Sequence, residues 1–202
     1  MKKKESTLWN MLWSLTLITA IAGGLLGYTY QLTEEPIARA AKASREKAIQ
    51  QVIPTYDNSP LDEQMTYTVH NEYGETTATI YPAKLGGKLA GAAVECSNNT
   101  GYGGEIRIIV GFEADGTIKD YQVLKHQETP GLGAKMGDWF RTDKNNQSII
   151  GKSPEECNFH VTKDSGDIDA ITAATITSRA FLAAVRTAYA AYTESLKGGN
   201  HE

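Results

Sequence analysis

The chain has 202 residues, with 20 Lys and Arg against 24 Asp and Glu, and a formal net charge of −4. Its length suits one domain with an appendage, since domains commonly take about 100–200 residues. A hydrophobic content of 41% argues against disorder. A mildly acidic chain without a long basic run has no electrostatic footprint for nucleic acid, which excludes DNA or RNA as a partner.

The N-terminal segment is apolar and long enough to cross a membrane. No charged residue occurs between Glu5 and Glu34, and the run Leu8–Gly27 is mostly apolar. A bilayer core needs about 20 such residues. Aromatic residues of the kind found at membrane interfaces flank both ends: Trp9, Trp13, Tyr28 and Tyr30. We therefore predict a cytoplasmic tail over residues 1–7 and a transmembrane helix over residues 8–30.

A cleaved signal peptide is the alternative for the same segment. Lys2–Lys4 would form its charged region, and Ala20–Ala22 resembles a small-residue cleavage site. The apolar character continues past Ala22, which favours a retained anchor. The three lysines before the span favour an inside N-terminus and a domain outside. Four basic residues beyond the span oppose this orientation: Arg39, Lys42, Arg45 and Lys47.

Residues 31–64 are predicted to form a stalk helix and a linker. Thr33 followed by two glutamates and Pro36 is typical of a helix start, with a hydroxyl cap, acidic residues in the first turn and an early proline. Apolar residues then recur at helical spacing until Pro54 stops the run. The stretch Thr55–Gln64 is polar, so the folded domain is expected over residues 65–202.

Strand patterns dominate the domain, and one long helix ends it. The β-branched or apolar runs are Met65–His70, Thr77–Tyr81, Leu89–Cys96, Ile106–Phe112 and Ile118–Leu124, with Asn158–Thr162 as a further short strand. Turns are predicted at Asn71–Glu75, Gly86-Gly87 and Asp115-Gly116, the last as a hairpin. An apolar stripe from Ile176 to Leu196 indicates a helix that ends at Gly198-Gly199. The fold class is α+β, mainly antiparallel, behind one membrane anchor.

Two loops contain residues suited to a ligand. Asn99–Gly104 is rich in glycine, but it is no dinucleotide fingerprint because Ile106 stands at the third glycine position and no helix follows. A tight turn is the favoured interpretation. Lys125–Gly133 combines one proline with two glycines, which fixes an unusual backbone path. His126 in this loop is favoured as an ordinary hydrogen-bonded histidine, because no second ligand lies at metal spacing.

The third stretch, Asp169–Ser178, places four hydroxyls at a predicted helix start. Capping explains one or two of them, and from composition alone capping is the favoured interpretation. The same position is a natural anion site, because the first amides of a helix and its dipole both favour a phosphate.

Cys96 and Cys157 cannot supply four ligands for an iron–sulfur cluster or structural zinc. Two separate thiols are favoured for them over a disulfide.

Together these three stretches resemble the FMN-binding domain family. Asp169–Thr175 is similar to the family's flavinylation motif, usually Asp-x-x-Ser/Thr-Gly-Ala-Thr. The preceding Gly101–Gly104 and Glu128–Gly133 segments are also similar to the family's, in the same order. With its single anchor, the chain resembles the G subunits of the Rnf complex along nearly its whole length. It is also similar to the C subunit of the sodium-pumping NADH:quinone reductase.

The resemblance implies that a flavin transferase attaches FMN, taken from FAD, to Thr175 through a phosphodiester. It implies a role for Asp169 in that attachment, and a flavin ring against the Thr129–Gly133 turn. Ala173 stands where the motif has glycine, and its methyl would be strained at a positive φ. The predicted cofactor-binding residues are Tyr102, Glu128, Thr129, Gly131, Leu132, Gly133, Asp169, Thr172, Ala173, Ala174 and Thr175. No catalytic residue and no metal site is predicted.

By the same resemblance, the chain is an electron-carrier subunit of an ion-translocating ferredoxin:NAD oxidoreductase in the bacterial inner membrane. Its FMN domain would face the extracytoplasmic side, and its partners would be the other membrane and peripheral Rnf subunits and the flavin transferase. Two alternatives stay open. One is a stand-alone membrane-tethered flavoprotein, and the other is a cofactor-free exported binding module in which Thr175 only caps a helix.

Overall fold

The computed structural model describes residues 7–53, 55–71 and 74–198 in two compact units, residues 1–44 and 45–202. The predicted cytoplasmic tail, the helix stop at Pro54, the centre of the Asn71–Glu75 turn and Gly199 lie partly or wholly outside the described residues.

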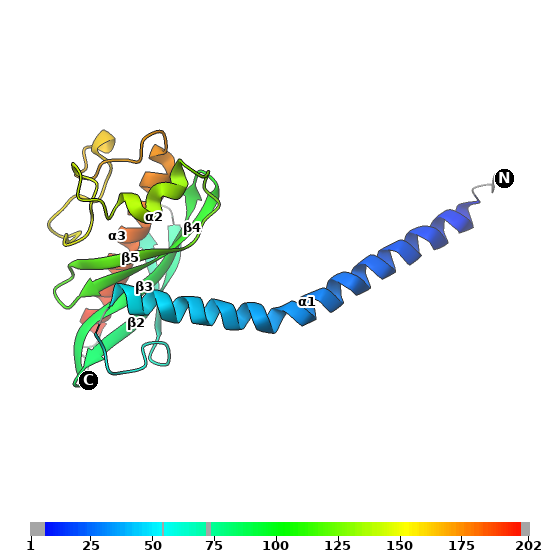
Figure 1. Cartoon of the computed structure of the whole chain (residues 1–202), viewed down its shortest axis with the longest axis horizontal. Coiled ribbons are helices and arrows are strands. Elements are labelled where there is room, and N and C mark those ends of the chain that lie inside the picture. Colours follow the sequence, from blue (N-terminus) through cyan, green and yellow to red (C-terminus); the bar gives the residue numbers. More distant parts are fainter. Residues whose placement is uncertain (1–6, 54, 72–73, 199–202) are drawn as a thin grey trace. The chain divides into compact units, whose positions relative to one another are not determined.

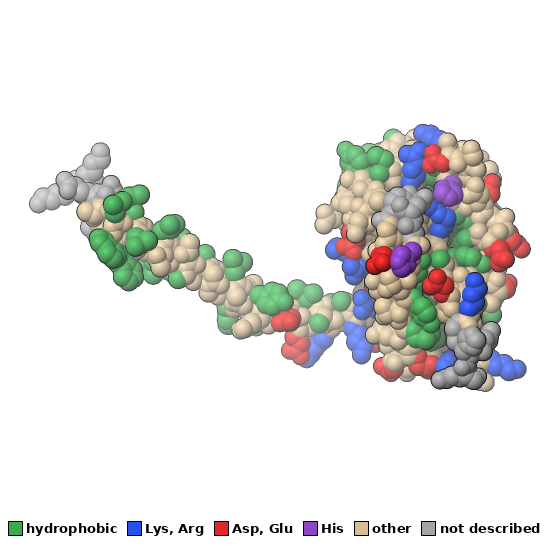
Figure 2. Space-filling model, turned by 180° about the vertical axis from the view of Figure 1, so that it is seen from behind, with side chains coloured by type: hydrophobic (Ala, Val, Ile, Leu, Met, Phe, Trp, Pro, Cys, Tyr) green, Lys and Arg blue, Asp and Glu red, His purple; other side chains and the backbone are tan. Residues whose placement is uncertain are grey.

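One uninterrupted helix, α1 (Leu8–Val52), contains both the predicted transmembrane segment and the predicted stalk. It is long and apolar enough to cross a membrane. In Figure 2 its first turns carry only apolar and other uncharged side chains, and charged groups follow towards its C-terminal part. The hydroxyls of Thr16 and Thr19 donate to the carbonyls of Leu12 and Leu15, at 2.9 Å each. These bonds satisfy the hydroxyls within the helix, which makes them compatible with an apolar surrounding.

The helix start predicted at Thr33 is wrong. The Thr33 hydroxyl donates to the Thr29 carbonyl at 2.8 Å, inside α1, instead of capping a new helix. Pro36 also lies inside α1. A cap signature marks a helix start only where the preceding residues are not helical, and here the apolar segment before Thr33 already forms the helix.

The domain is built on a five-stranded antiparallel sheet in the order β1-β2-β3-β4-β5. The strands are β1 (Met65–Asn71), β2 (Gly74–Leu85), β3 (Lys88–Gly101), β4 (Gly104–Glu113) and β5 (Ile118–Lys125). All five lie where strand patterns predicted them, and β2 and β3 are longer than predicted. The hairpin at Asp115-Gly116 is confirmed: the Gly116 amide donates to the Glu113 carbonyl at 3.0 Å, and Gly116 has a φ of +85°. The class predicted from the sequence, α+β and mainly antiparallel, is therefore confirmed.

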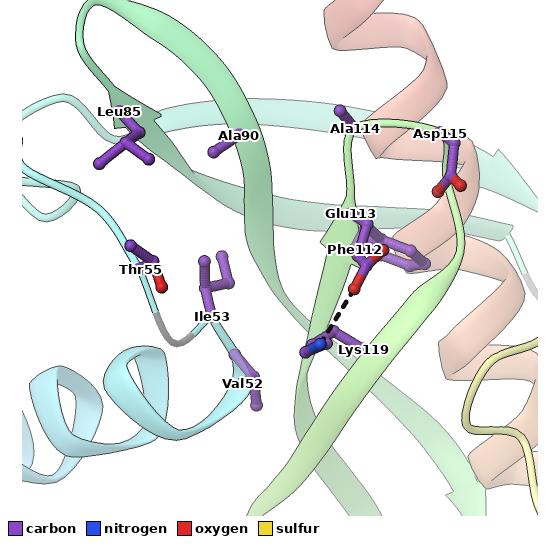
Figure 3. A pocket seen from close by; sticks show the side chains of 10 residues that line it. All are labelled: Val52, Ile53, Thr55, Leu85, Ala90, Phe112, Glu113, Ala114, Asp115 and Lys119. Carbon is purple, nitrogen blue, oxygen red and sulfur yellow. Dashed lines mark ion pairs between the residues drawn. The ribbon is translucent and has the colours of Figure 1, made fainter.

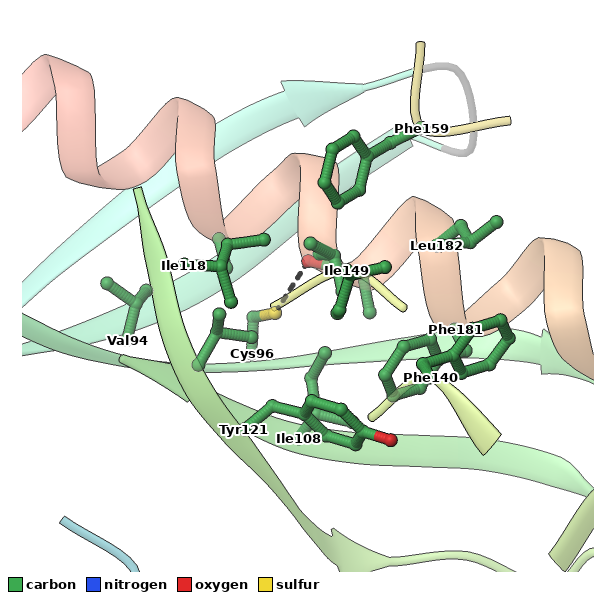
Figure 4. Close-up of a cluster of buried hydrophobic side chains, with 14 of the residues drawn as sticks. Val94, Cys96, Ile108, Ile118, Tyr121, Phe140, Ile149, Phe159, Phe181 and Leu182 are labelled. Atoms are coloured by element: carbon green, nitrogen blue, oxygen red, sulfur yellow. Dashed lines mark hydrogen bonds between the residues drawn. The ribbon is translucent and has the colours of Figure 1, made fainter. Parts of the chain in front are cut away.

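Helix α3 (Thr175–Gly198) lies along one face of this sheet, as Figure 1 shows. The main core fills the space between them (Figure 4), and in it the Phe181 ring contacts the rings of both Tyr121 and Phe140. Cys96 lies in this core and its Sγ donates to the Ala184 carbonyl at 3.1 Å. Burial raises the pKa of the Cys96 thiol to about 12. Cys96 and Cys157 are both free thiols, so no disulfide joins them.

The last turns of α1 pack on a smaller apolar cluster that also contains residues of β2, β3 and β4. Its buried members are Ala48, Ile49, Val52, Ile53, Tyr81, Ala83, Ala93 and Ile109. Beside it, the Arg45 guanidinium donates to both oxygens of Glu95, at 2.7 and 3.3 Å. The compact unit accordingly begins at Arg45, whereas strand patterns placed the domain start at Met65.

Between β5 and α3 the chain forms short elements and loops. These are the 3-10 helix η1 (Gly133–Lys135), the short helix α2 (Met136–Trp139) and the 3-10 helix η2 (Thr162–Asp164). The strand predicted at Asn158–Thr162 is wrong, because Val161 makes one isolated bridge to Ile168 and η2 begins at the next residue. A single bridge with a residue of the same loop extends no sheet.

Candidate functional site

A pocket of about 460 Å³ lies at the start of α3. Three segments far apart in the sequence line it: the β3–β4 turn, the loop after β5, and the first turn of α3 with the two residues before it. The lining residues are Tyr102, Glu128, Thr129, Leu132, Gly133, Ala173, Ala174, Thr175, Ile176 and Thr177. Small-molecule sites commonly have volumes of about 300–1,000 Å³. The pocket is therefore large enough for an organic cofactor.

Glu128 ties these three segments together. Its side chain is buried, with 5% of the residue exposed. Oε1 accepts a hydrogen bond from the Gly103 amide at 2.9 Å, and Oε2 accepts one from the Thr177 hydroxyl at 2.6 Å. Hydrogen bonds to a charged acceptor are stronger than neutral ones, and a buried carboxylate needs them. Glu128 therefore fixes the β3–β4 turn and α3 against its own loop.

Two glycines leave the room that this arrangement requires. A Cβ on Gly133 would lie 2.5 Å from Glu128 Oε2 and 2.6 Å from Thr177 Oγ1. A Cβ on Gly103 would lie 2.2 Å from the Gln127 carbonyl oxygen. Neither gap admits a methyl group. Gly103 and Gly133 thus serve the packing of the pocket walls, and the Asn99–Gly104 stretch contains the tight turn that its composition favoured.

Two of the four hydroxyls at the start of α3 serve the fold. The Ser178 hydroxyl accepts from the Ile171 amide and donates to the Ala174 carbonyl, at 2.9 Å each. The Thr177 hydroxyl is bound to Glu128. Thr172 is exposed and does not line the pocket. Thr175, the first residue of α3, is half-buried in the lining, so its hydroxyl lies at the site that the sequence singled out.

A basic side chain that sequence reasoning missed, that of Lys163, lies next to Thr175. Lys163 Nζ donates to Thr175 Oγ1 at 3.4 Å, across a separation of 12 residues. Lys163 belongs to η2, and the next residue, Asp164, accepts two hydrogen bonds from Arg179 of α3, at 2.6 and 2.7 Å. The Arg179 guanidinium holds the pKa of the Asp164 carboxyl below its usual range. No sequence spacing signals this proximity, because it arises from packing of η2 against α3.

Ala173 adopts a left-handed backbone conformation, with a φ of +62°. A residue with a Cβ is strained there, at a cost of about 1–2 kcal/mol. This is the condition under which the sequence predicted strain for an alanine in place of glycine. The backbone leading into the first turn of α3 is thus held in a conformation that glycine would adopt more easily.

Asp169 lies beside the pocket lining and holds a neighbouring loop. Its amide donates to the Asn146 carbonyl at 2.8 Å, its carboxylate accepts from the Asn146 amide at 3.3 Å, and its carbonyl accepts from Trp139 Nε1 at 2.9 Å. Gly131, with a φ of +78°, likewise lies outside the lining. The structure thus brings together eight of the predicted residues and adds Ile176 and Thr177.

Another hollow, of about 370 Å³, lies between the end of α1 and the β2–β3 and β4–β5 turns (Figure 3). Val52, Ile53 and Phe112 give it an apolar floor, and Lys119 pairs with Glu113 at 3.1 Å. Here Lys119 is in an ion pair, whereas Lys163 at Thr175 is in none with the described residues. Within the described ranges, no group of three or more His, Cys, Asp or Glu side chains is arranged to hold a metal ion.

The pocket at α3 fits a ligand with an apolar body and an anionic end. Tyr102, Leu132 and Ile176 expose 74%, 41% and 49% of their surface, although they are large apolar residues. They offer contact area to a planar group. The first amides of α3, which as in any helix lack partners within it, and Lys163 together offer donors to an anion. A flavin mononucleotide has these two parts.

Comparison with known proteins agrees with this fit. Residues 101–190 match the FMN-binding domain family, and residues 13–52 match the RnfG N-terminal region. The chain is therefore an FMN-binding electron-transport protein with an N-terminal membrane anchor.

Several proteins named as the G subunit of an ion-translocating oxidoreductase complex are similar to most of the chain. That of Aliivibrio fischeri (strain MJ11) is 38% identical over 86% of this chain and 85% of its own length. That of Vibrio cholerae (strain M66-2) is 35% identical over the same shares. That of Pseudomonas aeruginosa (strain UCBPP-PA14) is 33% identical over 92% and 88%. The chain belongs to this family, the G subunits of the Rnf electron-transport complex.

Proposed function

We propose that this chain carries one FMN bound through a phosphodiester to Thr175 and relays electrons within an ion-translocating ferredoxin:NAD oxidoreductase complex. The observation that carries the proposal is the position of the Thr175 hydroxyl, which lies in the pocket at the N-terminus of a 24-residue helix. A phosphodiester on that oxygen lies within the field of the helix start, where amides and dipole stabilise negative charge.

The residues of the pocket divide into an end that would bind the phosphate and an apolar wall. The first amides of α3 and the Thr175 oxygen would hold the phosphate, and Leu132, Ile176 and Tyr102 would contact the ring system. Glu128 keeps the walls in place through Gly103 and Thr177. Bound FMN supplies one- and two-electron redox chemistry, while the protein sets its position and environment.

The attachment has a balanced chemistry if FAD is the donor and a flavin transferase the catalyst. The Thr175 oxygen forms a bond to the phosphorus of the FMN half, and the pyrophosphate P–O bond to AMP breaks. AMP leaves and the hydroxyl proton is released to solvent. No change of oxidation state occurs, so no oxidant or reductant is needed.

The membrane arrangement follows from α1. We propose that residues 8–30 span the bacterial inner membrane and that the FMN domain lies on the extracytoplasmic side, because three lysines precede the span. A covalent link suits a domain outside the cytoplasm, where a free FMN pool would not replace a lost cofactor. Cysteine accessibility in intact cells tests the side: a cysteine replacing the exposed Lys144 should react with a membrane-impermeant maleimide.

Intact mass of the denatured protein tests the attachment. The full chain, purified from membranes of cells with an active transferase, should carry the added mass of one FMN, and Thr175→Val should lose it. Thr172→Val is the matched control, because its exposed hydroxyl lies outside the pocket lining, and it should stay modified. An unmodified wild type would favour a cofactor-free binding module. A modified chain that co-purifies with no other subunit would favour a stand-alone carrier.

A further inference from the structure

Lys163 is a basic residue at the site of attachment that forms no ion pair with any residue that the structure describes. Its Nζ contacts Thr175 Oγ1 at 3.4 Å, and within the described part of the chain it takes part in no ion pair. The nearest acidic residue in the sequence, Asp164, accepts hydrogen bonds from Nε and Nη2 of Arg179. Lys163 contributes to lowering the pKa of the Asp164 carboxyl, but it forms no ion pair with that carboxylate, whose two oxygens accept from Arg179.

The backbone around Lys163 is held firmly enough to aim the side chain. Val161, which precedes η2, is fully buried and bridges to Ile168. The Asp164–Arg179 pair joins the other end of η2 to α3, one helical turn beyond Thr175. Lys163 thus lies between a buried anchor and an ion pair, and both fix η2 beside the start of α3.

A cation beside Thr175 would offset the negative charge of the pocket. Among the lining residues the one charged group is the carboxylate of Glu128. Its two described partners, the Gly103 amide and the Thr177 hydroxyl, are both neutral. A phosphodiester on Thr175 would bring a second negative charge into the same pocket. Helix amides offset part of such a charge, and a lysine ammonium beside the attachment oxygen offsets more.

We propose that Lys163 binds the phosphate oxygens of the group attached to Thr175, both while the phosphodiester forms and after it has formed. This inference rests on the proposed covalent attachment to Thr175. In the attachment, the ammonium keeps its protons and acts as a positive charge next to the phosphoryl oxygens. It stabilises them while the bond to the Thr175 oxygen forms and AMP leaves. The Asp164–Arg179 pair is the positioning device for Lys163 and touches no part of the cofactor.

The test compares modified and unmodified full-length chain for four proteins: wild type, Lys163→Gln, Lys163→Arg and Lys88→Gln. The last is the matched control, since it removes the same charge at the β2–β3 turn, the opposite end of β3 from Tyr102. Each protein is expressed with and without the flavin transferase. Intact mass followed over time gives the rate of modification by purified transferase with FAD and Mg²⁺, and thermal unfolding gives the gain in Tm on modification.

We expect Lys163→Gln to be modified about tenfold more slowly than wild type, as for the loss of one charge-assisted hydrogen bond. The gain in Tm on modification should also be smaller in Lys163→Gln, and the difference should shrink at high salt because screening weakens a partly exposed charge pair. Lys163→Arg should recover most of both effects, and Lys88→Gln should behave as wild type. Unmodified Lys163→Gln should unfold like unmodified wild type, since the side chain is exposed.

Three results would overturn the proposal. Equal rates and equal Tm gains in wild type and Lys163→Gln would show that the lysine does not bind the phosphate. Slower modification with an unchanged Tm gain would show that the transferase recognises Lys163, and that the lysine does not hold the product. A wild type that is never modified would overturn the covalent attachment itself, and the role of Lys163 with it.

Discussion

Two buried carboxylates hold opposite parts of the domain, and they do so in different ways. Glu95 on the middle strand β3 faces the end of α1 and is neutralised by Arg45, with the Tyr81 hydroxyl donating to Oε2 at 2.9 Å. Glu128 faces the pocket and is held by a backbone amide and a hydroxyl. The first is an ion pair that fastens a helix, and the second is a carboxylate held by two neutral donors that shapes a cavity.

The difference follows from what each region has to do. An ion pair with an arginine tolerates water at its edge, and the Arg45 side chain is 35% exposed. Such a pair can join the last turns of the membrane helix to the sheet without a large core. A pocket that receives an anion is disturbed by any internal ion pair that competes for its cation. Glu128 uses neutral donors, which leaves Lys163 available at Thr175.

The largest effect is expected for Glu128→Ala. It removes the acceptor of both the Gly103 amide and the Thr177 hydroxyl, and a buried donor without a partner costs about 1–3 kcal/mol. We expect the free energy of unfolding to fall by about 3 kcal/mol, measured by urea denaturation of the full chain in detergent.

Glu128→Gln is the variant that separates charge from hydrogen bonding. The amide oxygen can still accept from Gly103, and its NH₂ can donate to the Thr177 oxygen. We expect a loss of only about 1 kcal/mol. Glu156→Ala, at an exposed position, should change little. If Glu128→Ala were as stable as Glu156→Ala, the carboxylate would not be what holds the pocket walls together.

The second effect concerns the other carboxylate. Arg45→Ala leaves the buried Glu95 with only its more distant cation, Arg107, at 3.9 Å. We expect the free energy of unfolding to fall by about 2 kcal/mol, less than for a fully buried pair because Arg45 is partly exposed. Glu95→Ala should cost a similar amount, and the double variant should cost less than the sum of the two.

The difference between that sum and the double variant measures the Arg45–Glu95 interaction directly. Lys119→Ala with Glu113→Ala is the control cycle, because that pair is more exposed, with both side chains near half exposure. Coupling in the control cycle as large as at Arg45 would mean that the fastening ion pair is no stronger than an ordinary surface pair.

Local patterns predicted the fold well because each strand and the final helix carry their own periodicity. The strand β4, for example, is mostly an apolar run between two glycine-containing turns, and its packing against α3 agrees with that pattern. The prediction failed at Thr33 and at Asn158–Thr162. In both places the outcome depended on neighbours: a helix already formed before Thr33, and the absence of a paired strand for Val161.

The candidate site was predicted less completely, and for a physical reason. Thr175 and the Glu128–Gly133 loop carry recognisable local sequence, so their resemblance to a family placed them at one site, and both line the pocket. Lys163 and Thr177 have no such signature. Their importance comes from contacts across the fold, Lys163 to Thr175 and Thr177 to Glu128, which no spacing along the chain encodes.

A third, smaller effect is expected for Ala173→Gly. The left-handed conformation costs alanine about 1–2 kcal/mol, and glycine loses about 0.5–1 kcal/mol in backbone entropy. The balance is a gain in stability of roughly 0.5–1 kcal/mol, measured by denaturation of the unmodified chain. Ala170→Gly is the control, because Ala170 has no positive φ and should lose stability. Equal losses for both glycine variants would mean that Ala173 is not strained.

The smallest effect concerns the pair that positions η2. The Arg179 guanidinium lowers the pKa of Asp164, so the folded chain holds the ionised form more strongly than the unfolded chain does. The contribution of the pair to stability is therefore complete above the ordinary aspartate pKa and is lost as the pH falls through the lower pKa of the folded chain.

Carboxyl ¹³C NMR of Asp164 should show a titration below the usual range, and Arg179→Gln should move that titration upward. Arg141→Gln, which removes the partner of Asp120, should leave Asp164 where it is. A titration of Asp164 that is the same with and without Arg179 would mean that the two side chains do not pair in solution, and that η2 is held by Val161 alone.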